Sequence, residues 1–213
     1  MKPAKKARAT PEPERSTDRG VRADKQRNLD ALLEAARAVF ATSGVDAPVR
    51  EIAAQAGVGL ATLYRHFPER SDLVAAVFRR EVDACAAAAP ELARHHGPEE
   101  ALARWLHRYA EFIAAKRGLA AALHSEDAAF KALPAYIREN LEPAIRSLLA
   151  AAVDAGRVRN DVEPYELLWA IANLCIPVAS VGPHHNRRMV DLLIDGLRFR
   201  GPGQAGSGER RAP

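Results

Sequence analysis

Gly57 divides the stretch VREIAAQAGVGLATLYRHF into two parts, each with a helical pattern. Ile52 and Ala56 recur at helical spacing before it, and a glycine directly after such a segment is typical of a helix that ends in the left-handed backbone region. Leu63 and Phe67, four residues apart, predict a second short helix. The stretch therefore predicts a helix-turn-helix, in which the second helix can enter the major groove of DNA.

With Leu63 and Phe67 facing inward, the other side chains of the predicted second helix can face outward, namely Leu60, Ala61, Thr62, Tyr64, Arg65 and His66. Arg50 carries a guanidinium that can donate to both O6 and N7 of guanine, and hydroxyl and imidazole groups suit phosphate oxygens. Residue by residue, other interpretations stay open. Arg50 could pair with Glu51 or Glu34, and Tyr64 and His66 could be ordinary surface residues. Taken together, the spacing favours DNA binding.

The pattern I-A-x-x-A-G-V-x-x-x-T-L-Y-x-H-F closely resembles the DNA-binding domain of the TetR (tetracycline-repressor) family of bacterial transcriptional regulators. The resemblance runs from about Lys25 to Cys85 and includes an upstream amphipathic helix that ends at Gly44. It implies base contacts from Arg50, Leu60, Ala61 and Thr62. It also implies phosphate contacts from Thr62, Tyr64, His66 and Arg70.

Two positions depart from the family pattern. Pro48 stands where many relatives have a threonine that caps the helix and touches phosphate, so we expect that contact to be absent, although proline is tolerated at a first helical position. Gly59 stands where a serine cap is common, and its loss costs a few tenths of a kcal/mol.

Composition predicts a soluble cytoplasmic protein. The 213 residues are 48% hydrophobic, with no apolar run long enough to span a bilayer and no secretory signal after Met1. Cys85 and Cys175 lie far apart without C-x-x-C spacing, which fits a reducing compartment and argues against a structural zinc site. Both are expected to be buried thiols, with redox sensing as the alternative. We expect no membrane partner, metal or cofactor.

The positive charge is concentrated at the amino end. Residues 1–27 hold nine Lys and Arg against four Asp and Glu, whereas the whole chain has a net charge of only +4. We expect residues 1–24 to form a disordered basic arm, because charge and proline leave little apolar surface to bury. Lys25 and Arg27 are candidate phosphate contacts next to the helix-turn-helix. A solubilising tail is the other interpretation for the part before Arg15.

The rest of the chain predicts helices and no strand, so the fold class is all-α. A three-helix DNA-binding domain over residues 25–70 precedes a larger effector-binding and dimerisation domain over residues 71–200, and residues 201–213 are a second disordered tail. The first long helix of the larger domain is expected to begin at Ser71 as N-cap. Further helices are expected from Pro98, from Pro134 to Gly156 with Pro143 inside, and over residues 163–180 and 186–198.

The last two predicted helices are more apolar than a monomer needs, which predicts a homodimer; the family resemblance implies the same, through a four-helix bundle. The candidate interface residues are Leu167, Ile171, Leu174, Val178, Met189, Leu193 and Leu197. Alternatively, these side chains complete the core of one subunit.

Aromatic side chains in the middle of the chain, together with two lone polar residues, predict a pocket for an unknown small-molecule effector. The candidate lining is Trp105, Tyr109, Phe112, His124, Phe130, Tyr136, Trp169 and Asn173. Each could instead be an ordinary core or interface residue.

The resemblance and the motif together predict a repressor that binds palindromic operator DNA as a homodimer and is released by its effector. An activator, or a regulator without an effector, stays open. An enzyme is not expected, because Gly57 and Gly59 lack the preceding strand of a dinucleotide site, and His124, Ser125 and Asp127 are too close in sequence for a hydrolase triad. A helical adaptor that binds protein is the third possibility.

Overall fold

The computed structural model describes residues 15–115, 128–175 and 184–199, and all of its regular elements there are helices. They are α1 (Arg15–Ser43), α2 (Val49–Gln55), α3 (Leu60–His66), α4 (Arg70–His95), α5 (Pro98–Ala115), α7 (Ala128–Lys131), α8 (Leu133–Asp154), α9 (Pro164–Leu174) and α10 (His185–Arg198). The prediction of an all-α chain is confirmed. Of the predicted site residues, His124 and Val178 lie outside the described ranges, as do most of the two predicted tails.

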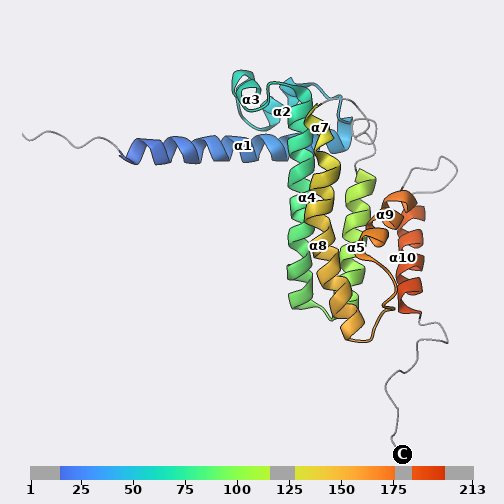
Figure 1. The fold of residues 1–213 in the computed structure, drawn as a ribbon. Coiled ribbons are helices and arrows are strands. Elements are labelled where there is room, and N and C mark those ends of the chain that lie inside the picture. The colour runs from blue at the N-terminus through green and yellow to red at the C-terminus, as the bar shows by residue number, and fades with distance from the viewer. Residues whose placement is uncertain (1–14, 116–127, 176–183, 200–213) are drawn as a thin grey trace, which may run out of the picture.

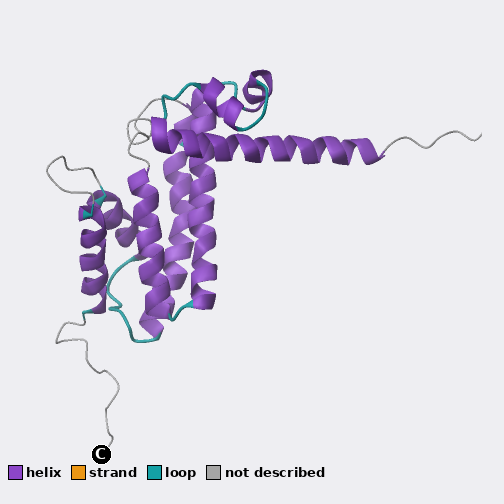
Figure 2. Cartoon of the chain, turned by 180° about the vertical axis from the view of Figure 1, so that it is seen from behind, coloured by secondary structure: helices purple, strands orange, loops and turns teal. Residues whose placement is uncertain are grey.

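The helices form two units that meet along α4 (Figure 1). Long helices α4, α5 and α8 lie side by side, and α9 and α10 cover the outer side of α5. At one end of this bundle, α2 and α3 sit over α1, and α1 protrudes on the side away from α9 and α10 (Figures 1 and 2). None of the helices in the three ranges has both the length and the apolar character needed to cross a membrane.

A small core holds the amino-terminal unit together. Leu32 from α1, Ile52 from α2 and Leu63 from α3 are at most 1% exposed and belong to one cluster. Leu73 and Val77 from α4 belong to the same cluster. The first turns of α4 are therefore part of this unit, and the predicted boundary at residue 71 cuts through its core.

The larger core is built around the remainder of α4. Phe78, Val82 and Cys85 point into it, where they join Trp105 of α5 and Ile145 of α8. Because buried side chains alternate between the two cores along α4, one continuous helix is packed into both units.

The start of α4 differs from the prediction. Its N-cap is Glu69 and not Ser71; the Glu69 side chain accepts from the backbone at the third helical position, and Asp72 accepts from the Glu69 amide at 3.1 Å. This reciprocal pair satisfies two of the amide groups that a helix start leaves without partners, so the helix begins two residues earlier than the Ser71 cap would allow.

The expected disordered arm is wrong for residues 15–24, because α1 begins at Arg15. From residue 24 onward, local side-chain pairs support the same helix: Arg27 binds Asp24, and Gln26 donates to Asp30 at 3.3 Å. The charge-rich composition that suggested disorder therefore also contains helix-forming residues at helical pairing distances.

Candidate nucleic-acid interface

The turn between α2 and α3 has the geometry that Gly57 predicts. Gly57 has φ of 68°, and the Gly57 and Val58 amides donate to Ala54 and Ala53 at 3.1 and 3.0 Å. Leu63 and Phe67 are 1% and 6% exposed and hold α3 against the small core. One face of α3 is thereby fixed inward and the opposite face outward.

The outward face of α3 brings the predicted contacts together. Leu60 and Tyr64 are 43% and 48% exposed, Ala61 is exposed, and Thr62 is half-buried. His66 is half-buried, with its ring centroid 6.2 Å from that of Phe67. Apolar, hydroxyl and imidazole groups therefore share the surface that a major groove would meet, as the motif predicts.

The starts of α2 and α3 have no side-chain caps, as Pro48 and Gly59 predict. Pro48 is the N-cap of α2 and not its first helical residue, and its carbonyl accepts from the Glu51 amide at 3.0 Å. Arg50 is exposed in the first turn of α2. The carboxylate of Glu34 binds Arg37 at 2.6 Å, so the alternative pairing of Arg50 with Glu34 is not the one formed.

Arg70 makes contacts that the sequence does not predict. Its half-buried guanidinium donates to the carbonyls of Val45 and Ala47, the latter at 2.6 Å, and so ties α4 to the loop between α1 and α2. The structure thus gives Arg70 a structural role, and its phosphate contact stays a prediction. Loop carbonyls leave no signature in a sequence, so only the fold could reveal these acceptors.

A groove of about 520 Å³ lies between α1 and α3. Its lining is Val21, Asp24, Lys25, Asn28, Thr62, Arg65 and His66. Lys25 and His66 were predicted phosphate contacts, whereas Asn28 and Arg65 were not. The signal for the missed residues is spacing: positions 21, 24, 25 and 28 share one helical face, which is the face turned towards α3.

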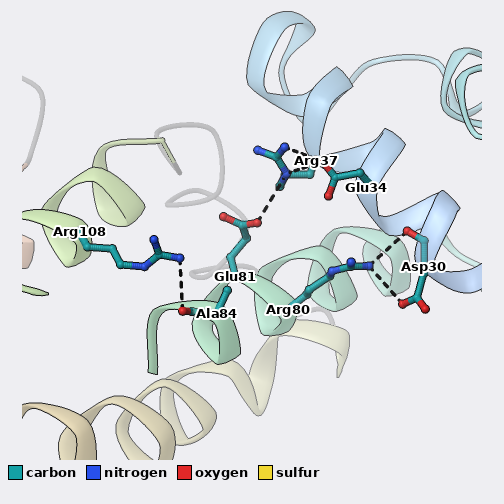
Figure 3. A network of polar contacts seen from close by, with 7 residues as sticks. All are labelled: Asp30, Glu34, Arg37, Arg80, Glu81, Ala84 and Arg108. Atoms are coloured by element: carbon teal, nitrogen blue, oxygen red, sulfur yellow. Dashed lines mark hydrogen bonds and ion pairs between the residues drawn. The ribbon is translucent and has the colours of Figure 1, made fainter. Parts of the chain in front are cut away.

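Polar contacts connect α1 to α4 and α4 to α5 (Figure 3). Arg80 donates to the backbone and side chain of Asp30 at 3.2 and 3.4 Å. Arg37 lies between Glu34 and Glu81, 3.9 Å from the latter, and its hydrogen bond to Glu34 lowers the pKa of that carboxyl. Helix α1, on which α2 and α3 rest, is thus linked to the middle of α4.

Arg108 of α5 continues this chain of contacts by donating to the Ala84 carbonyl of α4 at 3.3 Å (Figure 3). Arg108 and Ala84 also line an open groove of about 640 Å³, which α4, α5 and α10 enclose. Arg104, His107 and Arg187 contribute further basic groups to its walls.

The predicted effector-pocket residues that the structure describes do not form one pocket. Trp105, Tyr109, Phe112 and Phe130 are at most 7% exposed and fill the larger core, where Trp105 stacks on Tyr109 at 5.8 Å. The Trp105 indole donates to the Cys85 carbonyl at 2.9 Å. An aromatic cluster whose rings and polar atoms already contact protein is a packed core, so its aromatic content alone was a misleading signal.

The other predicted pocket residues lie elsewhere. Tyr136 is half-buried and donates to Asp83 at 2.5 Å, which raises the pKa of its phenol. Trp169 is 65% exposed on α9, and Asn173 is exposed and donates to the Trp169 carbonyl at 2.8 Å. Placing Trp169 and Asn173 in a buried pocket is therefore wrong.

The predicted interface residues divide into two groups. Leu167, Ile171 and Leu197 are at most 3% exposed and belong to the subunit's own core, as the alternative interpretation has it, although Leu167 and Leu197 also reach the groove between α9 and α10. Leu174, Met189 and Leu193 are half-buried and line an apolar groove of about 450 Å³ between α9 and α10.

Both cysteines are buried thiols, as predicted. Burial raises the pKa of Cys85 to about 12, so this thiol stays protonated at neutral pH. Cys175 packs where its sulfur reaches the Ala110 carbonyl at 3.7 Å.

Comparison with known proteins matches both units. Residues 32–77 match the model of bacterial regulatory proteins of the tetR family, and residues 97–199 match the C-terminal domain of SbtR-like transcriptional regulators. A TetR transcriptional regulator from Streptomyces coelicolor is 35% identical, with 79% of this chain and 97% of that protein covered and a TM-score of 0.66. A TetR regulatory protein from Mycobacterium vanbaalenii is 36% identical, with coverage of 84% and 99% and a TM-score of 0.63.

A curated relative, an HTH-type transcriptional regulator of Staphylococcus aureus, is 38% identical over 64 residues, which are 30% of this chain. The matched segment spans 35% of that regulator's length. Since the two solved relatives match along nearly their whole length and both helical units match the family's models, this chain belongs to the TetR family of bacterial transcriptional regulators.

Proposed function

We propose that this TetR-family regulator is a cytoplasmic repressor that binds palindromic operator DNA as a homodimer and is released by a small-molecule effector. One observation carries the proposal: the exposed face of α3 lies at one end of the bundle, and an apolar surface of α9 and α10 lies on its side. A protein that binds palindromic DNA as a dimer needs a helix that contacts the bases and a surface through which two subunits associate.

The apolar surface of α9 and α10 supports dimerisation. Trp169, Leu192 and Phe199 are 65%, 64% and 66% exposed, and Leu192 lines the groove that also contains Met189 and Leu193. Large exposed apolar side chains beside an apolar groove are typical of an interface. We propose that α9 and α10 of two subunits pack as a four-helix bundle about a twofold axis.

The dimer would present two copies of α3 to successive major grooves, about 34–36 Å apart. We propose that Arg50, Leu60, Ala61 and Thr62 contact base edges. Tyr64, His66 and Lys25 are proposed to contact phosphates, because their donors lie exposed or half-buried around the same face. Arg27 is proposed to join them from the exposed side of α1.

The groove between α4, α5 and α10 is our proposed effector site. Its walls carry the carboxylates of Glu91 and Glu111 as well, but three arginines, Arg104, Arg108 and Arg187, outnumber them and favour an anionic small molecule. Ala84 and Leu92 offer such a molecule an apolar wall. An anion bound to Arg108 competes with the Ala84 carbonyl, next to the part of α4 where Glu81 pairs with Arg37 of α1. An effector that prefers a different position of α4 must weaken DNA binding by its differential affinity for the two states.

DNA binding is tested with fluorescently labelled DNA from upstream of the protein's own gene, by anisotropy at several salt concentrations, beside light scattering of the protein alone. We expect a dimer, and an affinity that falls steeply as salt rises. Arg50→Ala should cost about 1–3 kcal/mol, chiefly at one base position of each half-site. A monomer, or equal affinity of the wild type for the upstream DNA and for random DNA, would contradict the proposal.

The effector site is tested by thermal shift with a panel of carboxylates and phosphate esters. We expect a compound that raises the melting temperature of the wild type and releases it from DNA, but does neither with Arg108→Gln/Arg187→Gln. The same shift in both proteins would place the ligand elsewhere.

A further inference from the structure

The amino-terminal half of α1 protrudes from the molecule (Figure 1). Residues 20–27 are all exposed, and from residue 20 onward Leu32 is the first fully buried side chain of the helix. At 1.5 Å per residue, the segment from Arg15 to Asn28 extends about 20 Å beyond the packed part. A helix with no buried face gains nothing from packing, and Gly20 weakens it further. Such a segment gains stability when a partner covers it.

The charge of the segment indicates what that partner is. Residues 15–28 contain five Lys and Arg and two Asp. Asp24 binds Arg27, while Lys25 lines the groove that separates α1 from α3. Arg65 lines the opposite wall of the same groove. Basic groups on both sides of a groove beside the reading helix suit a DNA strand, whose phosphates carry one negative charge per about 3.4 Å.

The direction of α1 indicates where on the DNA this contact occurs. The helix leaves the bundle on the side opposite to α9 and α10 in both views (Figures 1 and 2). In a dimer joined through α9 and α10, the two copies of α1 therefore point away from the twofold axis. The amino-terminal ends of these helices then lie farther from the twofold axis than the two copies of α3 do.

We propose that the protruding half of α1 binds the phosphate backbone of operator DNA outside the half-sites that α3 reads. The inference rests on the proposed function, since it needs a dimer on a palindrome. The 20 Å segment spans about six base pairs at about 3.4 Å each. Because its inner residues lie beside α3, these six base pairs are the upper limit of the flank on each side. These contacts add affinity without base recognition.

The experiment compares two duplexes that contain the same operator. The short one ends at the outer edges of the half-sites, and the long one continues for about six base pairs of arbitrary sequence on each side. Binding of the full chain is measured by anisotropy. The test variant is Arg22→Gln/Lys25→Gln/Arg27→Gln, and the matched control is Arg94→Gln/Arg146→Gln/Arg157→Gln, whose exposed arginines lie on α4, on α8 and in the loop after α8.

We expect wild type and control to prefer the long duplex, and the test variant to bind both duplexes equally. The test variant loses six phosphate contacts per dimer, so its slope of log affinity against log salt should be smaller by up to about 5. The wild type's preference for the long duplex over the short one should fall by up to about a thousandfold from about 50 to about 200 mM salt. Gly20→Ala should increase the preference, because an added Cβ meets no atom within 4 Å and strengthens the helix.

Equal affinity of the wild type for both duplexes would overturn this inference and leave the proposed function standing. A preference for the long duplex that the test variant retains would also overturn it, because the contact would then come from other residues. Failure of the wild type to bind either duplex would refute the proposed function and this inference together.

Discussion

The hydrogen bonds from Arg70 to the loop between α1 and α2 predict a specific result for Arg70→Met. The substitution keeps most of the aliphatic stem but removes the donors to Val45 and Ala47. A hydrogen bond from a charged donor contributes about 1.5–3 kcal/mol. Because Arg70 is half-buried and the loop carbonyls can partly regain water, we expect a loss of about 2 kcal/mol for both bonds together. For 213 residues this lowers Tm by roughly 4–8 °C.

The assay combines thermal unfolding, followed by circular dichroism, with anisotropy titrations of operator DNA well below Tm. Arg70→Met should lower Tm and leave the slope of log affinity against log salt unchanged, because the guanidinium of Arg70 bonds the loop carbonyls of Val45 and Ala47. The matched control is Arg65→Met, which removes an exposed guanidinium from the groove beside α1. The control should keep Tm and reduce the slope by about 2 for a dimer. An unchanged Tm with a smaller slope for Arg70→Met would refute the structural role.

Three further predictions concern the larger unit. Leu192→Glu should give a monomer in light scattering and weaken operator binding at an unchanged helical content, since the side chain is 64% exposed in one subunit; a variant that stays dimeric would contradict the interface. Glu142 accepts from Arg138 and Arg146, which lowers its pKa, so its stabilisation is present above the unfolded pKa of about 4.3 and is lost as pH falls through the folded pKa. Acid unfolding of Glu142→Gln should therefore depend less on pH than that of the wild type, and parallel curves would count against the pairing. Cys85 should resist a thiol reagent at pH 8 in the folded protein and react after unfolding, because burial raises its pKa to about 12; rapid labelling of the native chain at both cysteines would disprove that burial.

The sequence predicts the turn between α2 and α3 and the orientation of α3 well, because local rules determine them. The positive φ at residue 57 requires glycine, because other residues adopt this angle only at a cost. Leu63 and Phe67 are buried, so α3 can pack in only one orientation. The same is true of Gly44 and Gly156, which follow α1 and α8 with positive φ. Where the conformation of a single residue determines the local geometry, that geometry can be predicted from one sequence.

Prediction is weaker where a residue's role depends on distant parts of the chain. From the sequence alone, Arg70 is expected to be an exposed cation. Only the fold shows that the loop carbonyls of residues 45 and 47 lie beside it. Trp105 and Trp169 are equally apolar in sequence, yet one is fully buried and the other is 65% exposed. Helical periodicity shows that a face is apolar but does not say whether the subunit's own core or another chain covers it.

The way α4 contributes side chains to both cores has a consequence for modular exchange. A chimera that joins this amino-terminal unit to another regulator's ligand-binding part at residue 70 would leave out Leu73 and Val77, and with them one wall of the small core. A junction after residue 78 would retain that wall. It would also carry over Val74 and Phe78, which belong to the larger core, so the core of the other regulator's ligand-binding part would have to accommodate these two side chains. Domain swaps in this protein therefore require matching of side-chain shape along a shared helix and not only a suitable linker.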